Sequence, residues 1–161
     1  MTPTAPLELV ILVGVQGSGK STFARTRFTD THVFVSKDLM PNNRNKARRQ
    51  AQLIEQALEA GRSVILDNTN PTPEDRAGPI ELARTHGAAV TGYFFPTDVH
   101  AAVRRNHARE GRARVPDVAI YATAKKLTPP TPDEGFTRLY AVRLADAGAY
   151  DIIPWNAHEE Q

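Results

Sequence analysis

Short apolar runs alternate along the chain with stretches that have helical spacing. The run 9–13 is apolar throughout, and the runs 63–66 and 89–95 are mostly apolar, as expected for strands buried on both faces. Between the first two, residues 50–60 place their apolar side chains on one helical face, and Gly61 follows as a stop signal. This order predicts an α/β fold, with a central parallel sheet of about five strands flanked by helices.

Weaker patterns supply the remaining elements. Apolar runs at 32–35 and 139–144 complete the predicted strands. Helices are predicted from position 97 or 98 to about 108, and from 115 to 126. No composition shift divides the chain, so residues 1–161 are expected to form one domain, with a loose tail after about 155.

One predicted helix carries a conflicting signal. It is expected to begin at Thr72, whose hydroxyl can cap the helix. A proline and two acidic residues follow it, and this order favours a helix N-terminus. Pro79 lies inside the same stretch and lacks the N–H of a helical residue. We therefore expect a kink, or a restart of the helix near Glu81.

The first predicted strand leads into the loop GVQGSGKS at 14–21, which fills the phosphate-binding pattern G-x-x-x-x-G-K-[ST]. Glycines let the backbone curl so that N–H groups point at phosphate oxygens, and the following helix adds its positive dipole end. Lys20 would reach the β- and γ-phosphates, and the Ser21 hydroxyl would bind Mg²⁺. The pattern predicts a site for ATP and Mg²⁺ that is formed by Gly14, Gln16, Gly17, Ser18, Gly19, Lys20 and Ser21.

Composition limits the alternatives. The chain has 20 basic and 18 acidic residues, so its net charge does not indicate that it binds nucleic acid. It has no cysteine, which excludes a disulfide-linked partner and fits a reducing compartment. The apolar run near the N-terminus is too short to span a membrane. These features indicate a cytoplasmic enzyme that works without a membrane.

Two acidic residues directly follow predicted strands, at the sheet edge where ligands bind in parallel α/β folds. Asp38 follows the second strand and Asp67 the third. In kinases one acid accepts the proton of the acceptor hydroxyl. We predict that Asp38 is this general base, and that Asp67 binds the metal or orients the acceptor. The alternatives are a helix cap for Asp38 and a turn-forming role for Asp67.

Basic residues gather in two places. The run 104–114 contains five arginines and one glutamate around Gly111, which predicts a mobile, arginine-rich lid over the triphosphate. A solvated basic surface is the alternative. The second group follows Asp38 and would grip nucleic-acid phosphates, or else form an ordinary solvated helix face. This group comprises Arg44, Lys46, Arg48 and Arg49.

The order of these motifs resembles that of polynucleotide 5′-hydroxyl kinases, above all the kinase module of the eukaryotic kinase–phosphatase repair enzymes. The resemblance runs from about 9 to 144, and its most specific parts are DNTNP at 67–71, the segment 115–121 and PTPDEGF at 130–136. The lid also carries the N-x-x-R pattern of that family at 106–109. No D-x-D-x-T phosphatase signature occurs in the sequence.

This resemblance implies a P-loop kinase that moves the γ-phosphate of ATP to the 5′-OH of DNA or RNA. It places Lys20, Ser21 and Thr22 at the phosphates and Mg²⁺. Asp38 becomes the base for the 5′-OH and Arg109 the lid contact to ATP. Asp67 and Asn68 would lie near the acceptor. Since 39–49 does not align cleanly with the family, the arginine that orients the acceptor phosphate is left open among Arg44, Arg48 and Arg49.

Two other functions fit the same motifs. The first is a P-loop kinase of a small hydroxyl-bearing metabolite that uses the same Lys20, Ser21, Asp38 and Arg109. The second is an ATP-binding switch or ATPase module, which would leave Asp38 without a role as a base. The residue that stacks on adenine is also open, with Trp155 as a candidate whose more ordinary role is packing.

Overall fold

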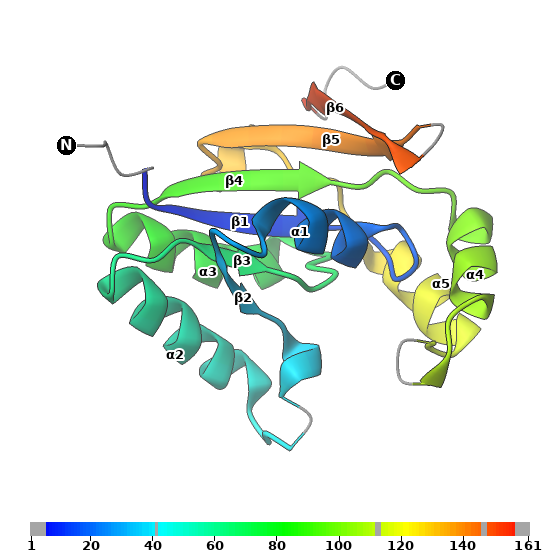
Figure 1. Cartoon of the computed structure of the whole chain (residues 1–161), viewed down its shortest axis with the longest axis horizontal. Helices are drawn as coiled ribbons and strands as arrows, with labels where there is room; N and C mark the ends of the chain where they lie inside the picture. The colour runs from blue at the N-terminus through cyan, green and yellow to red at the C-terminus, as the bar shows by residue number, and fades with distance from the viewer. Residues whose placement is uncertain (1–5, 41, 112–113, 146–147, 157–161) are drawn as a thin grey trace.

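A six-stranded sheet forms the centre of the protein (Figure 1), in a computed structural model that describes residues 6–40, 42–111, 114–145 and 148–156. The strand order is β2-β3-β1-β4-β5-β6. All neighbours pair in parallel except β5 and β6, which are antiparallel. The strands are β1 Glu8–Val13, β2 Val33–Val35, β3 Val64–Leu66, β4 Ala89–Phe94, β5 Arg138–Leu144 and β6 Tyr150–Pro154.

The predicted parallel α/β sheet is confirmed, and it carries one strand more than the sequence indicated. β6 turns back beside β5, where Leu144 lies opposite Tyr150 and Ala141 opposite Ile153. The strand is short, ends in a proline and exposes Ile153, so its pattern is weak without its partner. Its pairing with β5, rather than its own sequence, defines it.

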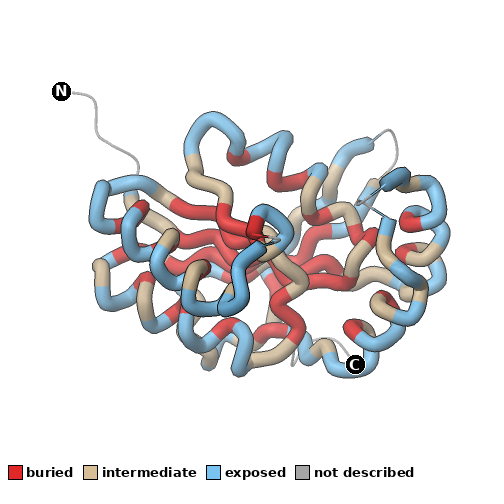
Figure 2. Tube along the Cα trace, turned by 90° about the horizontal axis from the view of Figure 1, so that it is seen from below, coloured by how far each residue is buried: buried red, intermediate tan, exposed pale blue. Residues whose placement is uncertain are grey.

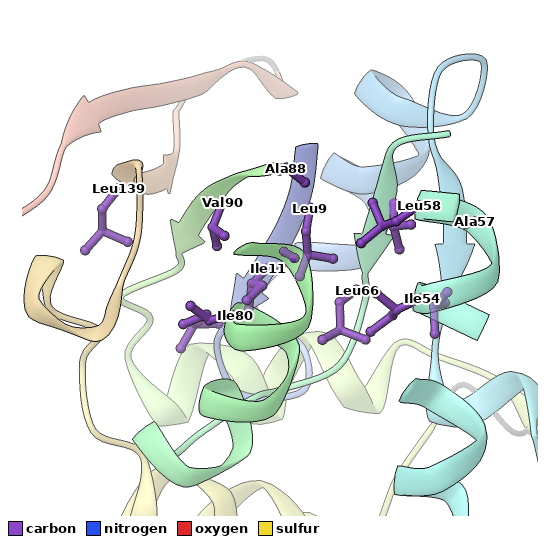
Figure 3. Packing of buried hydrophobic residues seen from close by; sticks show 14 of the residues in the cluster. Leu9, Ile11, Ile54, Ala57, Leu58, Leu66, Ile80, Ala88, Val90 and Leu139 are labelled. Carbon is purple, nitrogen blue, oxygen red and sulfur yellow. The ribbon is translucent and has the colours of Figure 1, made fainter. Parts of the chain in front are cut away.

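Helices cover both faces of the sheet. On one face, α2 (Lys46–Glu59) and α3 (Pro73–Thr85) pack on alternate β1 residues such as Leu9 and Ile11 (Figure 3). On the other face, α1 (Lys20–Phe28) packs on Val10 and Leu12 between them. Burial is therefore concentrated along the central strands, with the outer turns exposed (Figure 2). Two-sided burial explains why β1 has no polar alternation.

The start of α3 is as predicted, but the expected restart near Glu81 is wrong. Thr72 and Asp75 form a reciprocal capping box, and Pro73 occupies the first turn. The helix then runs without interruption through the buried Pro79 to Thr85. Ile80 and its neighbours on this face pack against the sheet, and this packing holds both sides of the proline in one helix.

Two further helices lie beyond the carboxyl ends of the strands, α4 (Val99–His107) and α5 (Asp117–Lys126) (Figure 1). Asp98 caps α4 by accepting a hydrogen bond from the His100 N–H. Trp155 packs against Phe94, and its indole N–H donates to a backbone carbonyl at 3.1 Å. The tryptophan is thus part of the core. None of the helices within the described ranges is both long and apolar enough to cross a membrane.

Candidate nucleotide-binding site

The loop between β1 and α1 has the curled backbone that its glycines predicted. Gly17 and Gly19 have φ angles of 81° and 96°, in the left-handed region that disfavours other residues. A Cβ atom at Gly17 would also lie 2.4 Å from the Ala102 carbonyl oxygen of α4. Arg105 of α4 donates to the Gly17 carbonyl at 3.1 Å. The loop is therefore held between α1 and α4, and Gly17 allows that close approach.

Lys20 is buried beneath this loop. Its Nζ donates to the Val15 carbonyl at 2.8 Å. Burial lowers the pKa of Lys20 to about 8, nearby Asp67 and Asp38 oppose that shift, and Arg109 adds to it. A buried ammonium with few counter-charges is prepared to bind an anion, because a phosphate would stabilise its charged form. Lys20 thus fits the predicted contact with the nucleotide phosphates.

The Ser21 hydroxyl donates to the Asp67 carboxylate at 3.0 Å, joining the start of α1 to the end of β3. Burial raises the pKa of Asp67, and the hydrogen bond from Ser21 acts in the opposite direction. A hydroxyl and a carboxylate at this spacing offer the hard oxygen ligands that Mg²⁺ prefers. The pair therefore fits the predicted metal site.

One cavity of about 490 Å³ brings most of the predicted residues together. Asp38 and Asp67 lie in its wall with Lys20, and Arg109 reaches it from the lid segment. The loop residues Gly14, Ser18 and Gly19 belong to the adjoining backbone rather than to this lining. The described residues that line the cavity are Gln16, Gly17, Lys20, Ser21, Thr22, Arg25, Asp38, Asp67, Asn68, Thr69, Arg109 and Val115.

Asp38 sits in a short 3₁₀ turn, η1 (Lys37–Leu39), just after β2. The Ser36 hydroxyl caps this turn by accepting from the Asp38 N–H at 3.2 Å. The Asn68 side chain accepts from the Lys37 N–H and donates to Gln50 of α2, both at 2.9 Å. Asn68, predicted to lie near the acceptor, thus also fixes the turn that carries Asp38.

The second basic group lies outside this lining. Arg44 and Arg48 are exposed around the start of α2, where Asn45 caps the helix by accepting from the Arg48 N–H. Arg49 is half-buried and donates to Gln52 at 3.4 Å. Their roles toward an acceptor stay predictions, and the open surface leaves them accessible to one.

The lid segment is fixed at both ends. Asn106 of α4 is fully buried and pairs with the backbone N–H and carbonyl of Val115. His107 contacts Asp117 of α5 at 2.9 Å. Arg109 lies between these ties. Arg112, part of the predicted arginine-rich run, lies outside the described residues.

A second buried network was missed by sequence reasoning. Arg76 of α3 is fully buried and makes two bonds, of 2.7 and 3.0 Å, to the Glu134 carboxylate. It also donates to the carbonyl of Asn70, whose own side chain donates to the Leu12 carbonyl. No local pattern links Arg76 to Glu134, and the network ties α3 to the loop after β3 and to the turn before β5.

Comparison with known proteins places the chain in a family. Residues 9–130, most of the chain, match the family described as AAA domain. The chain belongs to the AAA domain family. Its phosphate-binding loop is the P-loop of these nucleotide-binding proteins, so nucleotide binding at the 490 Å³ cavity agrees with the family.

Individual relatives of this AAA domain include polynucleotide kinases. The bifunctional polynucleotide phosphatase/kinase of Schizosaccharomyces pombe is 30% identical over 153 residues, which cover 92% of the chain and 36% of that protein. The chain therefore spans about a third of the length of this relative. The resemblance noted from the sequence is confirmed.

Solved structures share the fold of this AAA domain. A fungal RNA kinase has a TM-score of 0.66 at 16% identity, with 89% of the chain and 40% of that structure covered. A sugar kinase from Janibacter sp. HTCC2649 has a TM-score of 0.64 at 20% identity, with 86% of each chain covered. These neighbours confirm a P-loop kinase fold and leave the acceptor open.

Proposed function

We propose that the chain is an ATP-dependent polynucleotide 5′-hydroxyl kinase, which transfers the γ-phosphate of ATP to the 5′-OH of DNA or RNA. The observation that carries the proposal is the position of Asp38 in one cavity wall with Lys20, Asp67 and Arg109, directly beside the phosphate loop. The similarity to a polynucleotide phosphatase/kinase supports the polynucleotide as acceptor. ATP, Mg²⁺ and a cytoplasmic location belong to the same proposal.

In the proposed reaction, the Asp38 carboxylate accepts the proton of the acceptor hydroxyl while the hydroxyl oxygen forms a bond to the γ-phosphorus. The bond between the γ-phosphorus and the bridging oxygen breaks, and ADP leaves. Lys20 and Arg109 neutralise charge on the transferred group. Mg²⁺, when bound at Ser21 and Asp67, would shield the β- and γ-phosphate oxygens. Arg44, Arg48 or Arg49 would hold the acceptor phosphates, since Arg44 and Arg48 lie exposed beyond η1 and Arg49 is half-buried beside them.

A second candidate is a kinase of a small hydroxyl compound, favoured by the shared fold of the sugar kinase. The two candidate functions predict a different dependence of acceptor binding on salt concentration. If basic residues hold a phosphate backbone, acceptor binding must weaken steeply as salt is added. An acceptor constant that salt does not change would favour the small compound.

The deciding experiment supplies ATP labelled at the γ-phosphate to 5′-OH oligonucleotides of both sugars and to a panel of small hydroxyl compounds. Label on an oligonucleotide 5′ end supports the proposal. Label on a small compound alone supports the second candidate. ATP hydrolysis without a labelled acceptor would overturn both and favour the ATPase module.

A further inference from the structure

A second cavity lies between α2 and α3, beside the nucleotide site. This α2–α3 groove has a volume of about 510 Å³. Ala51 and Ile54 of α2, with Pro79 and Leu82 of α3, give it an apolar floor. Ligand pockets of this size accept a flat organic group and cover most of its surface.

Hydrogen bonds connect the lining of the α2–α3 groove to the lining of the nucleotide site. Lys37 and Gln50 line the groove, and Asn68, which bonds to both, lines the other cavity. Lys37 is followed directly by Asp38, the proposed base. A substrate whose hydroxyl lies at Asp38 can therefore extend over Lys37 into the groove.

The rim of the groove selects the kind of group that can enter. Glu74 and Glu81 of α3 line it and are exposed, whereas Lys37 is the one basic residue among its described lining. Carboxylates repel phosphate oxygens and accept N–H donors. A nucleobase has two apolar faces and, in adenine and cytosine, an amino group on its edge. The rim and floor together match a base and oppose a phosphate.

We propose that the α2–α3 groove binds the terminal nucleobase of the acceptor strand, an inference that rests on the proposed function. The base lies on the apolar floor while the 5′-OH reaches Asp38. The phosphates leave the groove on the side of the exposed Arg44 and Arg48. Bases with an exocyclic amino group are preferred over thymine and uracil, whose corresponding position is an acceptor.

Gly78 of α3 offers a sharp test. It lines the groove, and a Cβ atom there would meet no other atom within 4 Å. Gly78→Phe fills the groove, and Gly78→Ala is the matched control, because both improve helix propensity relative to glycine. Each variant is assayed with a 5′-OH oligonucleotide and with the same oligonucleotide bearing an abasic sugar at its 5′ end.

The wild type and Gly78→Ala are expected to have a KM about tenfold lower for the strand that bears the base, as burial of one base supplies roughly that factor. Gly78→Phe should raise this KM to the abasic value, with kcat and ADP affinity unchanged. Phosphorylation of both strands with equal KM by the wild type, or an unchanged ratio in Gly78→Phe, overturns the groove proposal alone. Failure of the wild type to phosphorylate any oligonucleotide overturns the proposed function, and the groove proposal with it.

Discussion

Asn106 holds Val115 by two hydrogen bonds: its amide nitrogen donates to the Val115 carbonyl at 2.6 Å, and its oxygen accepts from the Val115 N–H at 2.9 Å. The two residues are the ends of the segment that carries Arg109. Val115 also lines the nucleotide cavity. One buried amide therefore sets the separation of the two ends, and with it the place from which Arg109 reaches the site.

Asn106→Ala should lower kcat about tenfold or more, because it leaves two backbone groups of Val115 unpaired and frees the end of the lid segment. The variant should also lose about 1–3 kcal/mol of unfolding free energy. Phosphate transfer is measured well below the unfolding temperature, so that the lower stability of the variant does not reduce the measured kcat. Val118→Ala, at an exposed position of α5, leaves both lid ties in place and serves as the control. Wild-type kcat in Asn106→Ala would show that the lid does not depend on this tie.

Asp38→Asn tests the proposed base. The change keeps the shape of the side chain, and the Ser36 cap uses only the backbone N–H of residue 38. Transfer should fall by about 10²–10⁴-fold, the usual range for a lost general base. ADP affinity, measured by calorimetry, should stay within a factor of about two or three, since Asp38 does not hold the phosphates. Asp30→Asn, at an exposed position after α1, is the control. A normal transfer rate in Asp38→Asn removes this residue from the mechanism.

The sequence predicts the parts of this site that depend on local pattern. A phosphate loop between a strand and a helix needs only neighbouring residues, and acids that follow parallel strands must meet at one edge of the sheet. The positions of Asp38 and Asp67 after parallel strands are enough to place both acids at this edge. The central strands were predicted for the same reason, since burial on both faces leaves a continuous apolar run.

Contacts between distant segments left no such pattern. Arg76 and Glu134 are 58 positions apart, and the residues around each of them give no indication that the two form an ion pair. Asn68 was assigned to the acceptor, and its bonds to the Lys37 N–H and to Gln50 could not be read from its position after a strand. β6 depends in the same way on its pairing with β5. The helix continues through Pro79 without the expected restart because packing of α3 on the sheet outweighs a single lost hydrogen bond.

Arg109→Ala should lower transfer and weaken ATP binding together. Arg109 lines the cavity and acts on the charge of Lys20, so it is near the place where the triphosphate is proposed to lie. We expect a loss of about 10–10³-fold in kcat/KM, comparable to the removal of one electrostatic contact to a transition state. Arg104→Ala, exposed on α4, is the control. A change in oligonucleotide affinity alone would mean that Arg109 contacts the acceptor and not ATP.

Arg76→Met should destabilise the protein by about 3–5 kcal/mol, because it leaves the Glu134 carboxylate without its buried partner. Glu134 would keep only its bond from the Thr131 N–H. The double variant Arg76→Met with Glu134→Gln should recover part of the loss, since no unpaired charge remains. Urea unfolding of the two variants and the wild type measures both values. Equal stability of Arg76→Met and the wild type would show that the ion pair does not tie α3 to the turn before β5.

Lys20→Met should stabilise the protein without ligand while abolishing transfer. Burial lowers the pKa of Lys20 from 10.5 to about 8, so below pH 8 the folded state carries a charge that the unfolded state holds more easily. Relief of this penalty adds up to about 3 kcal/mol to the unfolding free energy at pH 7. As pH rises from about 8 toward 10.5, the folded lysine loses its proton first and the wild type gains stability. The advantage of Lys20→Met should therefore shrink over that range.

Denaturant unfolding at pH 7 and at pH 9.5 measures this difference. Lys125→Met, at an exposed position of α5, is the control and should follow the wild type at both pH values. The same shift predicts that ADP binding above pH 8 takes up a proton, since the phosphates restore the charged lysine. Calorimetry in buffers of different ionisation enthalpy detects that proton. An advantage of Lys20→Met that stays constant with pH, together with ADP binding that takes up no proton, would mean that Lys20 is fully charged before the nucleotide arrives. The phosphate loop would then bind its ligand with a lysine no different from one at the surface.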